Sequence, residues 1–347
     1  MGHPPIPPAA SSASAALAPA GPSIWWWALG YYACYVPYSA LTKLVTSSSA
    51  HVATPPVRGL ELLPPSVMAS VAATFAFLFA TGWWRHAGRR SILGLKLPLP
   101  GRLTALSGLC SAGIIATTTL AYTFSGLSLV LAALLMRGGV LVIAPIVDRL
   151  TGRRVRWFSW LALALSMASL VAAFASSRDD ARMPVLAAVD IALYLGCYFT
   201  RLTLMSRKAK ADHATNRRYF VEEIMVSSPA LLVAIALGAL LLGGDTGAQL
   251  AAGFTSFFTR DVWPLGLVIG VMSQGTGIFG GLIFLDNRET SFCVPVNRAS
   301  SVLAVLTASL VLAATVGSAA PRRDEWLGAV LILAALAVLT LAPRWRR

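Results

Sequence analysis

Charged side chains are scarce in this sequence: Asp, Glu, Lys and Arg make up 12% of 347 residues. Soluble domains usually carry about 25% charged residues, so the deficit argues against a soluble globular enzyme. Apolar residues instead reach 56%, and the mean hydropathy is +0.70. At about 20 apolar residues per transmembrane helix, the chain is long enough for ten membrane spans with room left for loops.

Cysteine and histidine are also rare, with four residues of each. The cysteines lie in apolar stretches without a C-x-x-C pair, and the histidines are scattered through polar segments. Metal sites need clustered ligands, and a disulfide framework needs several suitably spaced cysteines. The sequence therefore predicts no metal site, no disulfide framework and no cofactor.

The chain divides into one polar tail and ten apolar runs. Residues 1–23 are rich in Pro, Ala and Ser, contain no Lys or Arg, and are predicted to form a disordered tail. Polar segments separate the apolar runs, which we interpret as membrane-spanning helices. The runs are Ile24–Thr46, Ser66–Trp84, Leu103–Tyr122, Leu127–Leu150, Trp157–Ala175, Val185–Leu204, Tyr219–Leu242, Trp263–Leu285, Thr290–Val316 and Trp326–Ala342. We therefore predict an all-α integral membrane protein with ten transmembrane helices.

The basic residues are distributed unevenly between the two sides that ten spans define. Of 28 Lys and Arg residues, 18 fall on the side that holds both termini, 6 on the other side and 4 within the spans. Cytoplasmic loops of membrane proteins are enriched in Lys and Arg. The bias predicts a multi-pass protein of the cell (inner) membrane with cytoplasmic N- and C-termini. It also explains the formal charge of +14 without a nucleic-acid partner.

The two halves of the chain share a weak internal repeat, in which landmark residues recur at an offset of 161 to 163 positions. The pairs are Cys34 and Cys197, Tyr35 and Tyr198, Glu61 and Glu223, Gly108 and Gly270, Gly113 and Gly275, and Arg137 and Arg298. Because each half has five spans, an odd number, the second half must enter the membrane from the opposite side. The sequence thus predicts two inverted five-helix repeats, over residues 24–175 and 185–342, as in many secondary transporters.

Two stretches resemble a known family: SLVLAALLMRGGVLVIAPIVDRLTGRRVRWFSWLALALS at 128–166 and RRDEWLGAVLILAALAVL at 322–339. They are similar to the EamA-like drug/metabolite transporter (DMT) superfamily, whose members consist of two five-helix repeats. The resemblance extends over about residues 24–342 and implies a transporter fold. In the sugar-phosphate and nucleotide-sugar branches of that superfamily, cations on the fourth and ninth helices bind anionic groups. Arg137 and Arg298 lie on the matching helices.

Three arginines fall within the predicted spans: Arg137, Arg201 and Arg298. Arg137 and Arg298 lie about 12–15 Å from their helix ends, which places them near the midplane of the membrane. A cation at that depth costs several kcal/mol and should face the bundle interior or water. We expect these side chains to line the substrate path and to favour a substrate with an anionic group. Structural ion pairs between packed helices are the alternative interpretation.

Tyrosines recur on one face of the first and sixth predicted helices, at Tyr31, Tyr35, Tyr38, Tyr194 and Tyr198. The spacing of i, i+4 and i+7 keeps the first three on one side of a helix. The repeat offset aligns Tyr38, the third of these tyrosines, with Arg201. Tyrosine hydroxyls need hydrogen-bond partners away from water, so these rings either line a polar cavity or pack between helices.

Four further polar residues are candidates for the site. Gln274 and Asn297 lie within spans and are expected to bind substrate or to hydrogen-bond between helices. Glu61 and Glu223 are candidate proton-coupling groups, because burial raises the pKa of a carboxyl group. The alternative for both is a carboxylate at the depth of the membrane interface, paired with a nearby Arg.

Together these features predict a secondary transporter that moves a small metabolite by alternating access around a midplane cavity between the repeats. The short links Thr123–Gly126 and Asp286–Glu289 form equivalent helix hairpins that are suited to act as gates. The alternatives are an exporter of amphipathic drugs or lipid-linked metabolites and an integral-membrane enzyme, although no histidine lies within a span. The expected partners are a small-molecule substrate, the lipid bilayer and a coupling proton, and the expected assembly is a monomer or homodimer.

Overall fold

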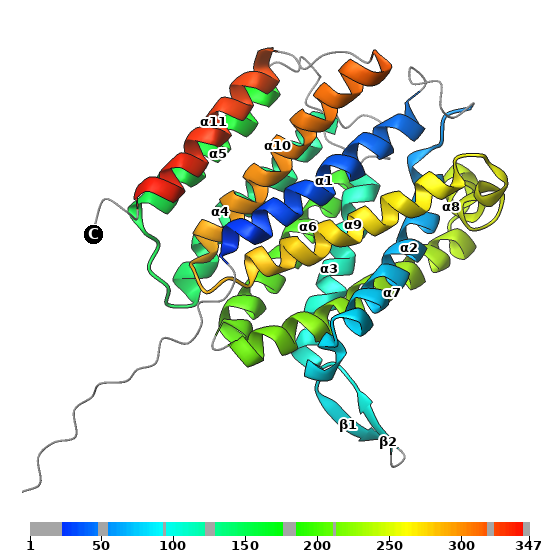
Figure 1. The fold of residues 1–347 in the computed structure, drawn as a ribbon, viewed down its shortest axis with the longest axis horizontal. Helices are drawn as coiled ribbons and strands as arrows, with labels where there is room; N and C mark the ends of the chain where they lie inside the picture. Colours follow the sequence, from blue (N-terminus) through cyan, green and yellow to red (C-terminus); the bar gives the residue numbers. More distant parts are fainter. Residues whose placement is uncertain are drawn as a thin grey trace, which may run out of the picture.

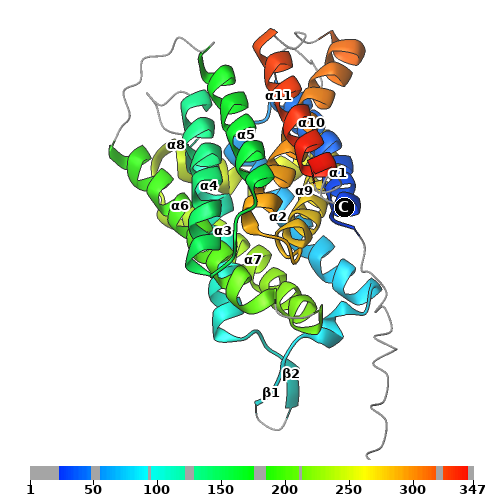
Figure 2. The ribbon, with the colours of Figure 1, turned by 90° about the vertical axis from the view of Figure 1, so that its left-hand side faces the viewer.

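The computed structural model describes residues 23–47, 55–92, 95–121, 129–175, 185–210, 213–317 and 323–342, which leaves all but Ser23 of the predicted tail outside it. These residues form a helical bundle with one short β-hairpin (Figure 1, Figure 2). The helices are α1 (Ile24–Thr46), α2 (Gly59–Ala80), α3 (Arg102–Ala121), α4 (Leu129–Leu150), α5 (Trp157–Ala175), α6 (Val185–Leu204), α7 (His213–Leu241), α8 (Gly244–Phe254), α9 (Trp263–Phe284), α10 (Thr290–Val316) and α11 (Arg323–Leu341). The strands are β1 (Arg89–Ile92) and β2 (Leu95–Pro98).

Each predicted apolar run overlaps one of these helices, but α2 begins at Gly59 and not at Ser66, and α7 begins at His213 and not at Tyr219. An additional short helix, α8, lies between α7 and α9. Among the described residues, five helical stretches are long and apolar enough to cross a membrane, and α5 and α11 contain shorter apolar stretches. The five are Gly59–Ala80, Val185–Ala209, Ala214–Leu241, Trp263–Phe284 and Thr290–Val316. The chain therefore has the character of a multi-pass membrane protein.

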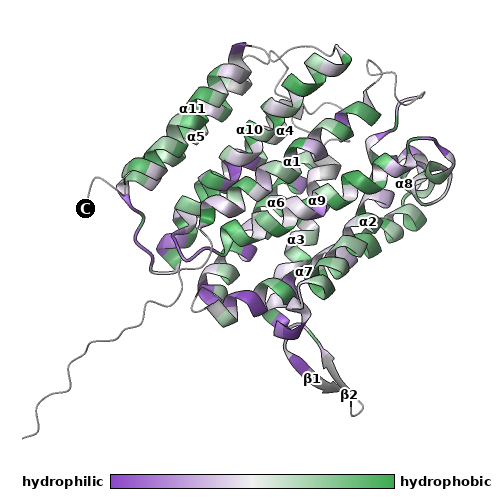
Figure 3. Cartoon of the chain, viewed as in Figure 1, coloured by the Kyte–Doolittle hydropathy of each residue, from purple (hydrophilic) through white to green (hydrophobic). Residues whose placement is uncertain are grey.

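The distribution of side chains between surface and interior also fits a membrane protein. On α6, Val185 and Leu186 are 80% and 70% exposed, whereas Asp190, Tyr194 and Tyr198 are buried. A water-soluble protein shows the opposite arrangement, with polar side chains outside. Figure 3 shows hydrophobic residues along much of the helical ribbon and hydrophilic residues near the hairpin end of the bundle. On α6, apolar side chains thus face outward and polar side chains face the interior.

The hairpin between α2 and α3 is a feature that the sequence did not predict. Its strands pair in antiparallel register, with Arg89 opposite Pro98. Both ends of the connection are attached to the buried carboxylate of Glu222 on α7. This carboxylate accepts hydrogen bonds from the backbone N–H groups of Gly88 at 3.0 Å and Gly101 at 2.8 Å. One side chain therefore closes the loop that contains the hairpin.

The helices of the two halves pack in matching pairs. Helix α1 packs against α9 and α10, and α6 packs against α3 and α4. In the same way, α2 contacts α9 and α7 contacts α3. The order of the long helices matches α1 to α5 of the first half with α6, α7, α9, α10 and α11 of the second. Three further contacts, α2 with α7, α4 with α10 and α5 with α11, join matching helices of the two halves. When each helix is replaced by its match in the other half, this set of helix pairs stays the same.

Glycines that repeat in the sequence occupy equivalent places in this packing. A Cβ atom at Gly113 on α3 would lie 3.0 Å from the Sγ of Cys197 on α6. A Cβ atom at Gly275 on α9 would lie 2.6 Å from the Sγ of Cys34 on α1. Both glycines therefore allow a close approach of the same kind of helix pair, with a cysteine as the neighbour.

We predict that Gly270→Ala destabilises the protein by about 1–3 kcal/mol, the usual cost of overpacking a core. The added Cβ atom would collide with the backbone carbonyl oxygen of Ser66 on α2, which cannot rotate away. Gly277→Ala on the same helix is the matched control, because no atom lies within 4 Å of its new methyl group. Thermal unfolding in detergent should show a lower Tm for the first variant only. Equal Tm values for the two variants would refute this account of the α2–α9 contact.

Candidate functional site

A cavity of about 840 Å³ lies between the two halves of the bundle. This volume is in the range of small-molecule binding sites. Residues from α1, α2, α3, α4, α6, α7, α8, α9 and α10 line it. Among these are the predicted site residues Tyr31, Tyr35, Tyr38, Arg137, Tyr194, Tyr198, Arg201, Glu223, Gln274, Asn297 and Arg298. Glu61 is the exception: it does not line the cavity and pairs with Arg260, Oε1 to Nη1, at 2.9 Å.

Arg298 carries a guanidinium edge that has no partner. Its Nε and Nη2 atoms are shielded from solvent and have no hydrogen-bond acceptor among the described residues. The guanidinium carbon lies 5.4 Å from the ring centroid of Tyr198, so the charge rests against an aromatic face. Nε and Nη2 form the side of the guanidinium that holds a carboxylate or phosphate through two parallel hydrogen bonds. This edge is therefore suited to an anionic group in the cavity.

Arg137 on α4 supplies a second cation to the cavity. No hydrogen bond or ion pair joins it to another residue within the part of the chain that the structure describes. The repeat relates Arg137 to Arg298 on α10, and the fold brings both to one cavity as expected.

Arg201 on α6 differs from these two arginines, because it already has a counter-ion. Its Nε lies 2.5 Å from Oε1 of Glu223 on α7. The hydroxyl groups of Ser107 and Ser111 on α3 donate to the same oxygen at 2.9 Å and 2.8 Å. These serines were not predicted, although their i, i+4 spacing on an apolar helix could have indicated a polar face. The charged side chains in the cavity wall thus sum to three cations and, apart from the exposed Asp245 at its rim, one anion.

Tyrosine rings form two groups in the cavity wall. On α1, the ring centroids of Tyr31 and Tyr35 are 5.4 Å apart, and those of Tyr35 and Tyr38 are 5.5 Å apart. On α6, the centroids of Tyr194 and Tyr198 are 4.9 Å apart. Aromatic walls of this kind provide apolar contact area together with hydroxyl groups for hydrogen bonding.

The two predicted amide residues also line the cavity, with different surroundings. Gln274 on α9 accepts a hydrogen bond from the hydroxyl of Ser228 on α7 at 3.1 Å, so its oxygen joins two helices. Asn297 on α10 is buried, and its Nδ2 would be 3.3 Å from a Cβ atom at Gly280. Gln274 therefore has an inter-helix role, and Asn297 faces the narrow space that Gly280 leaves.

The cavity extends toward α8, whose residues Asp245 and Gln249 belong to its lining. Helix α8 lies away from the hairpin end of the bundle in both views (Figure 1, Figure 2). At this mouth, the exposed side chains of Arg58 and Asp245 pair, with Nη1 2.6 Å from Oδ1.

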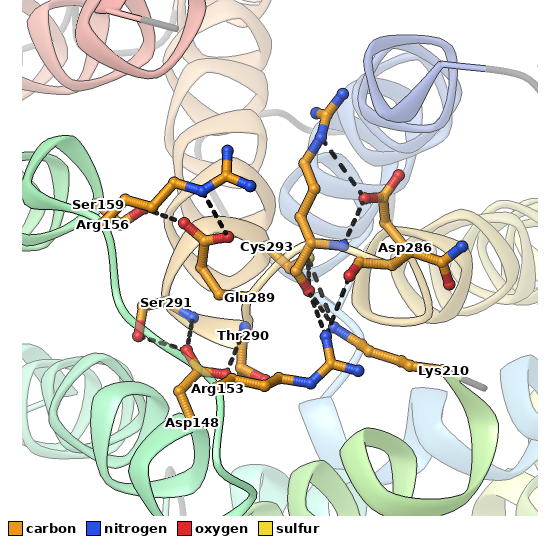
Figure 4. Close-up of polar contacts among 12 residues, drawn as sticks. Asp148, Arg153, Arg156, Ser159, Lys210, Asp286, Glu289, Thr290, Ser291 and Cys293 are labelled. Carbon is orange, nitrogen blue, oxygen red and sulfur yellow. Dashed lines mark hydrogen bonds and ion pairs between the residues drawn. The ribbon is translucent and has the colours of Figure 1, made fainter.

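A polar network holds the link between α9 and α10 (Figure 4), which lies at the end of α9 remote from α8 (Figure 1). The fully buried carboxylate of Asp148 on α4 accepts hydrogen bonds from the backbone N–H groups of Thr290 at 2.8 Å and Ser291 at 2.7 Å. It therefore caps the N-terminus of α10 from a different helix. Arg153 donates to the backbone carbonyl oxygen of Asn287 at 3.0 Å. Residues of the first half thus form hydrogen bonds with the Asp286–Glu289 link of the second half and with the start of α10.

Two more contacts complete this network. Lys210, between α6 and α7, donates to the carbonyl oxygen of Arg288 at 2.8 Å. Ser159 on α5 donates to Oε1 of Glu289 at 2.8 Å. The sequence indicated a gate at this link but did not indicate its contact residues. The nearby Arg153 and Lys210 were interpreted only as cytoplasmic charges that define the topology. The equivalent link, Thr123–Gly126, lies outside the described residues.

Comparisons with known proteins inform the fold and not the function. No protein-family model and no curated protein matches the sequence. Twenty-seven chains of solved structures match it. One of them, described as "Crystal structure of protein", has a TM-score of 0.55 and 18% sequence identity, over 91% of this chain and 99% of that chain. At this identity the likeness shows the fold alone.

The different surroundings of the arginines predict opposite effects on stability. Arg201→Met should destabilise the unliganded protein by about 3–5 kcal/mol, because Glu223 would remain buried without its counter-ion. Arg298→Met should leave stability unchanged or raise it, because the replaced guanidinium edge has no partner to lose. Thermal unfolding of the two variants and of the wild type in one detergent measures the difference. A loss of stability in Arg298→Met as large as that in Arg201→Met would show that Arg298 is structural.

Proposed function

We propose that this protein is a secondary transporter for a small metabolite with an anionic group, working by alternating access around the cavity between its two halves. The observation that carries the proposal is the unpartnered Nε and Nη2 edge of Arg298 in that cavity. A buried cation without a counter-ion is costly, so it is expected where an anionic ligand completes the pair. Arg137 adds a second positive charge to the same cavity.

The architecture we propose is ten membrane spans arranged as two inverted five-helix repeats, over residues 24–175 and 185–342. The matched helix contacts support it, because α1 with α9 and α6 with α3 are the same pair under exchange of the halves. The glycine and cysteine contacts at Gly113 and Gly275 support it in the same way. Inverted repeats of this kind place a substrate site near the midplane. We propose that the chain belongs with the EamA-like drug/metabolite transporters that it resembles.

We propose the cell (inner) membrane as its location, with both termini cytoplasmic, from the excess of Lys and Arg on that side. In this orientation α8 and the cavity mouth face outward, and the α9–α10 link faces the cytoplasm. The network around Asp148 and Arg153 then closes the inner end. Transport would require this network to open while the outer mouth closes.

Export of amphipathic drugs or lipid-linked metabolites is the second candidate function. The five tyrosines of the cavity wall favour a ligand with a ring or another flat apolar part. In this case the aromatic walls, and not the guanidinium groups, would supply most of the affinity. An integral-membrane enzyme is the remaining alternative. A monomer and a homodimer both fit this proposal.

Ligand binding to the purified protein tests the substrate class. The panel contains benzoate, phenyl phosphate, phenylalanine and tetraphenylphosphonium, which share a ring and differ in charge. An anion at 100 times its Kd should stabilise the protein by about 2.7 kcal/mol if it binds only the folded state. We expect benzoate or phenyl phosphate to raise the Tm of the wild type but not of Arg298→Ala.

The control for this experiment is Arg58→Ala, which removes an exposed Arg that pairs with Asp245 at the mouth. It should keep the response to the anions. If only tetraphenylphosphonium stabilises the wild type, the anion proposal is wrong and drug export becomes the better explanation.

Opening of the inner end can be followed through Cys293, which is fully buried beneath the α9–α10 link. Asp148→Asn removes one of the acceptor oxygens that cap α10, so the closed state should lose stability and Cys293 should react faster with a membrane-impermeant maleimide. Asp286→Asn is the matched control, because Asp286 contacts Arg288 within the link and not the other half. Labelling in inside-out vesicles with and without Cys293→Ser isolates this thiol. Equal labelling rates in both variants would argue against Asp148 as a gate residue.

A further inference from the structure

The two carboxylate oxygens of Glu223 have very different surroundings. The side chain is 1% exposed. Oε1 accepts hydrogen bonds from Arg201 at 2.5 Å and from two serine hydroxyls of α3. Oε2 is shielded from solvent and has no donor among the described residues. An ionised carboxylate accepts on both oxygens, so half of this group lacks a partner.

A second buried polar atom lies nearby on the same helix. Tyr219 precedes Glu223 by one turn of α7 and is close enough to interact with it electrostatically. Its hydroxyl oxygen forms no well-aligned hydrogen bond within the described part of the chain, and its neighbour there is Ser107, which donates to Oε1 of Glu223. A proton on Oε2 of Glu223 would turn that oxygen into a donor, and a neighbouring hydroxyl oxygen is a suitable acceptor. The site is therefore arranged for a neutral carboxyl group as well as for an ionised one.

The state of Glu223 determines the charge of the cavity. While it is ionised, it occupies Arg201, and Arg137 and Arg298 are the cations left for a ligand. When it is protonated, Arg201 loses its counter-ion and becomes a third guanidinium that can bind an anion. Proton binding and anion binding at this cavity therefore favour each other, and the coupling acts equally in both directions.

The repeat-related glutamate lacks this arrangement. Glu61 lies outside the cavity, pairs with Arg260, and has Tyr38 where the second half has Arg201. Among the described residues, the pair that could couple a proton to an anion, Arg201 with Glu223, thus occurs in the second half without an equivalent in the first.

We propose that Glu223 is the proton-binding site of this protein and that an anion and a proton are bound together. The anion accepts hydrogen bonds from Arg201, which leaves Oε1 of Glu223, and Oε2 of Glu223 takes up one proton from water. The positive charge of the proton balances the negative charge of the ligand. This inference rests on the proposed function, since it assigns the coupling proton of the same cavity.

Other titratable groups surround this carboxylate. Arg201 on α6, Tyr219 on α7 and Cys110 on α3 interact with Glu223 directly. Tyr198 and Cys197 on α6 lie one step further away, where they interact with Arg201 and Cys110. Glu223 is the carboxyl group among them, so Glu223→Gln isolates its contribution. Glu61→Gln is the matched control, because it removes the repeat-related carboxylate without touching the cavity.

The experiment measures benzoate binding to the detergent-solubilised full chain by titration calorimetry. Two buffers with different enthalpies of ionisation report the number of protons taken up per benzoate bound. Measurements run from about pH 6 to about pH 8.5, where benzoate stays ionised. We expect the wild type to take up close to one proton and to bind more weakly as the pH rises, by at most about tenfold per pH unit.

The variants separate the outcomes. Glu223→Gln should bind benzoate without proton uptake and with an affinity independent of pH, and Glu61→Gln should behave as the wild type. Proton uptake that persists in Glu223→Gln, or its absence in the wild type, overturns the inference while the transporter proposal stands. If Glu223→Gln does not fold, the wild-type proton count decides alone. If no anion of the panel binds the wild type, the proposed function itself fails.

Discussion

The cost of placing a guanidinium away from water is the constraint on which this structure depends. Such a group must be paired, solvated or held for a ligand. The chain meets the constraint in two ways. Arg201 is paired with Glu223 at 2.5 Å, and the guanidinium edge of Arg298 is left without an acceptor in the described structure. The first arrangement stabilises the contact of α6 with α7, and the second gives up stability for a place where an anionic group can bind.

Close helix packing brings these charges to one cavity. Gly270 touches the backbone of α2, and Gly113 and Gly275 each receive a cysteine from the facing helix. Because the same helix pairs occur in both halves, residues at repeat-related positions meet around a common centre. Arg137 and Arg298, which are far apart in the sequence, both line the cavity for this reason. The stability of the α2–α9 contact and the geometry of the site are thus two results of one packing pattern.

The features that the sequence allowed us to predict are those with a periodic or repeated signal. Apolar runs located the long helices, and the offset between the halves selected Tyr31, Tyr194, Arg137 and Arg298. Contacts that occur once in the chain gave no such signal. Glu222 closes the hairpin loop through Gly88 and Gly101, more than 100 positions away. Asp148 caps α10 across 142 positions. Within the described residues neither contact has a counterpart in the other half, so the pattern that revealed the cavity could not reveal them.

These unrepeated contacts are also what makes the two halves differ. The offset of 161 positions that relates Arg137 to Arg298 places Ser309 opposite Asp148, so the aspartate itself is not repeated. An offset of 162 positions pairs Glu223 with Glu61, whose partner Arg260 lies outside the cavity. The Asp148 cap at the α9–α10 link and the Glu223 carboxylate in the cavity are therefore enough to make the two halves of the bundle chemically different.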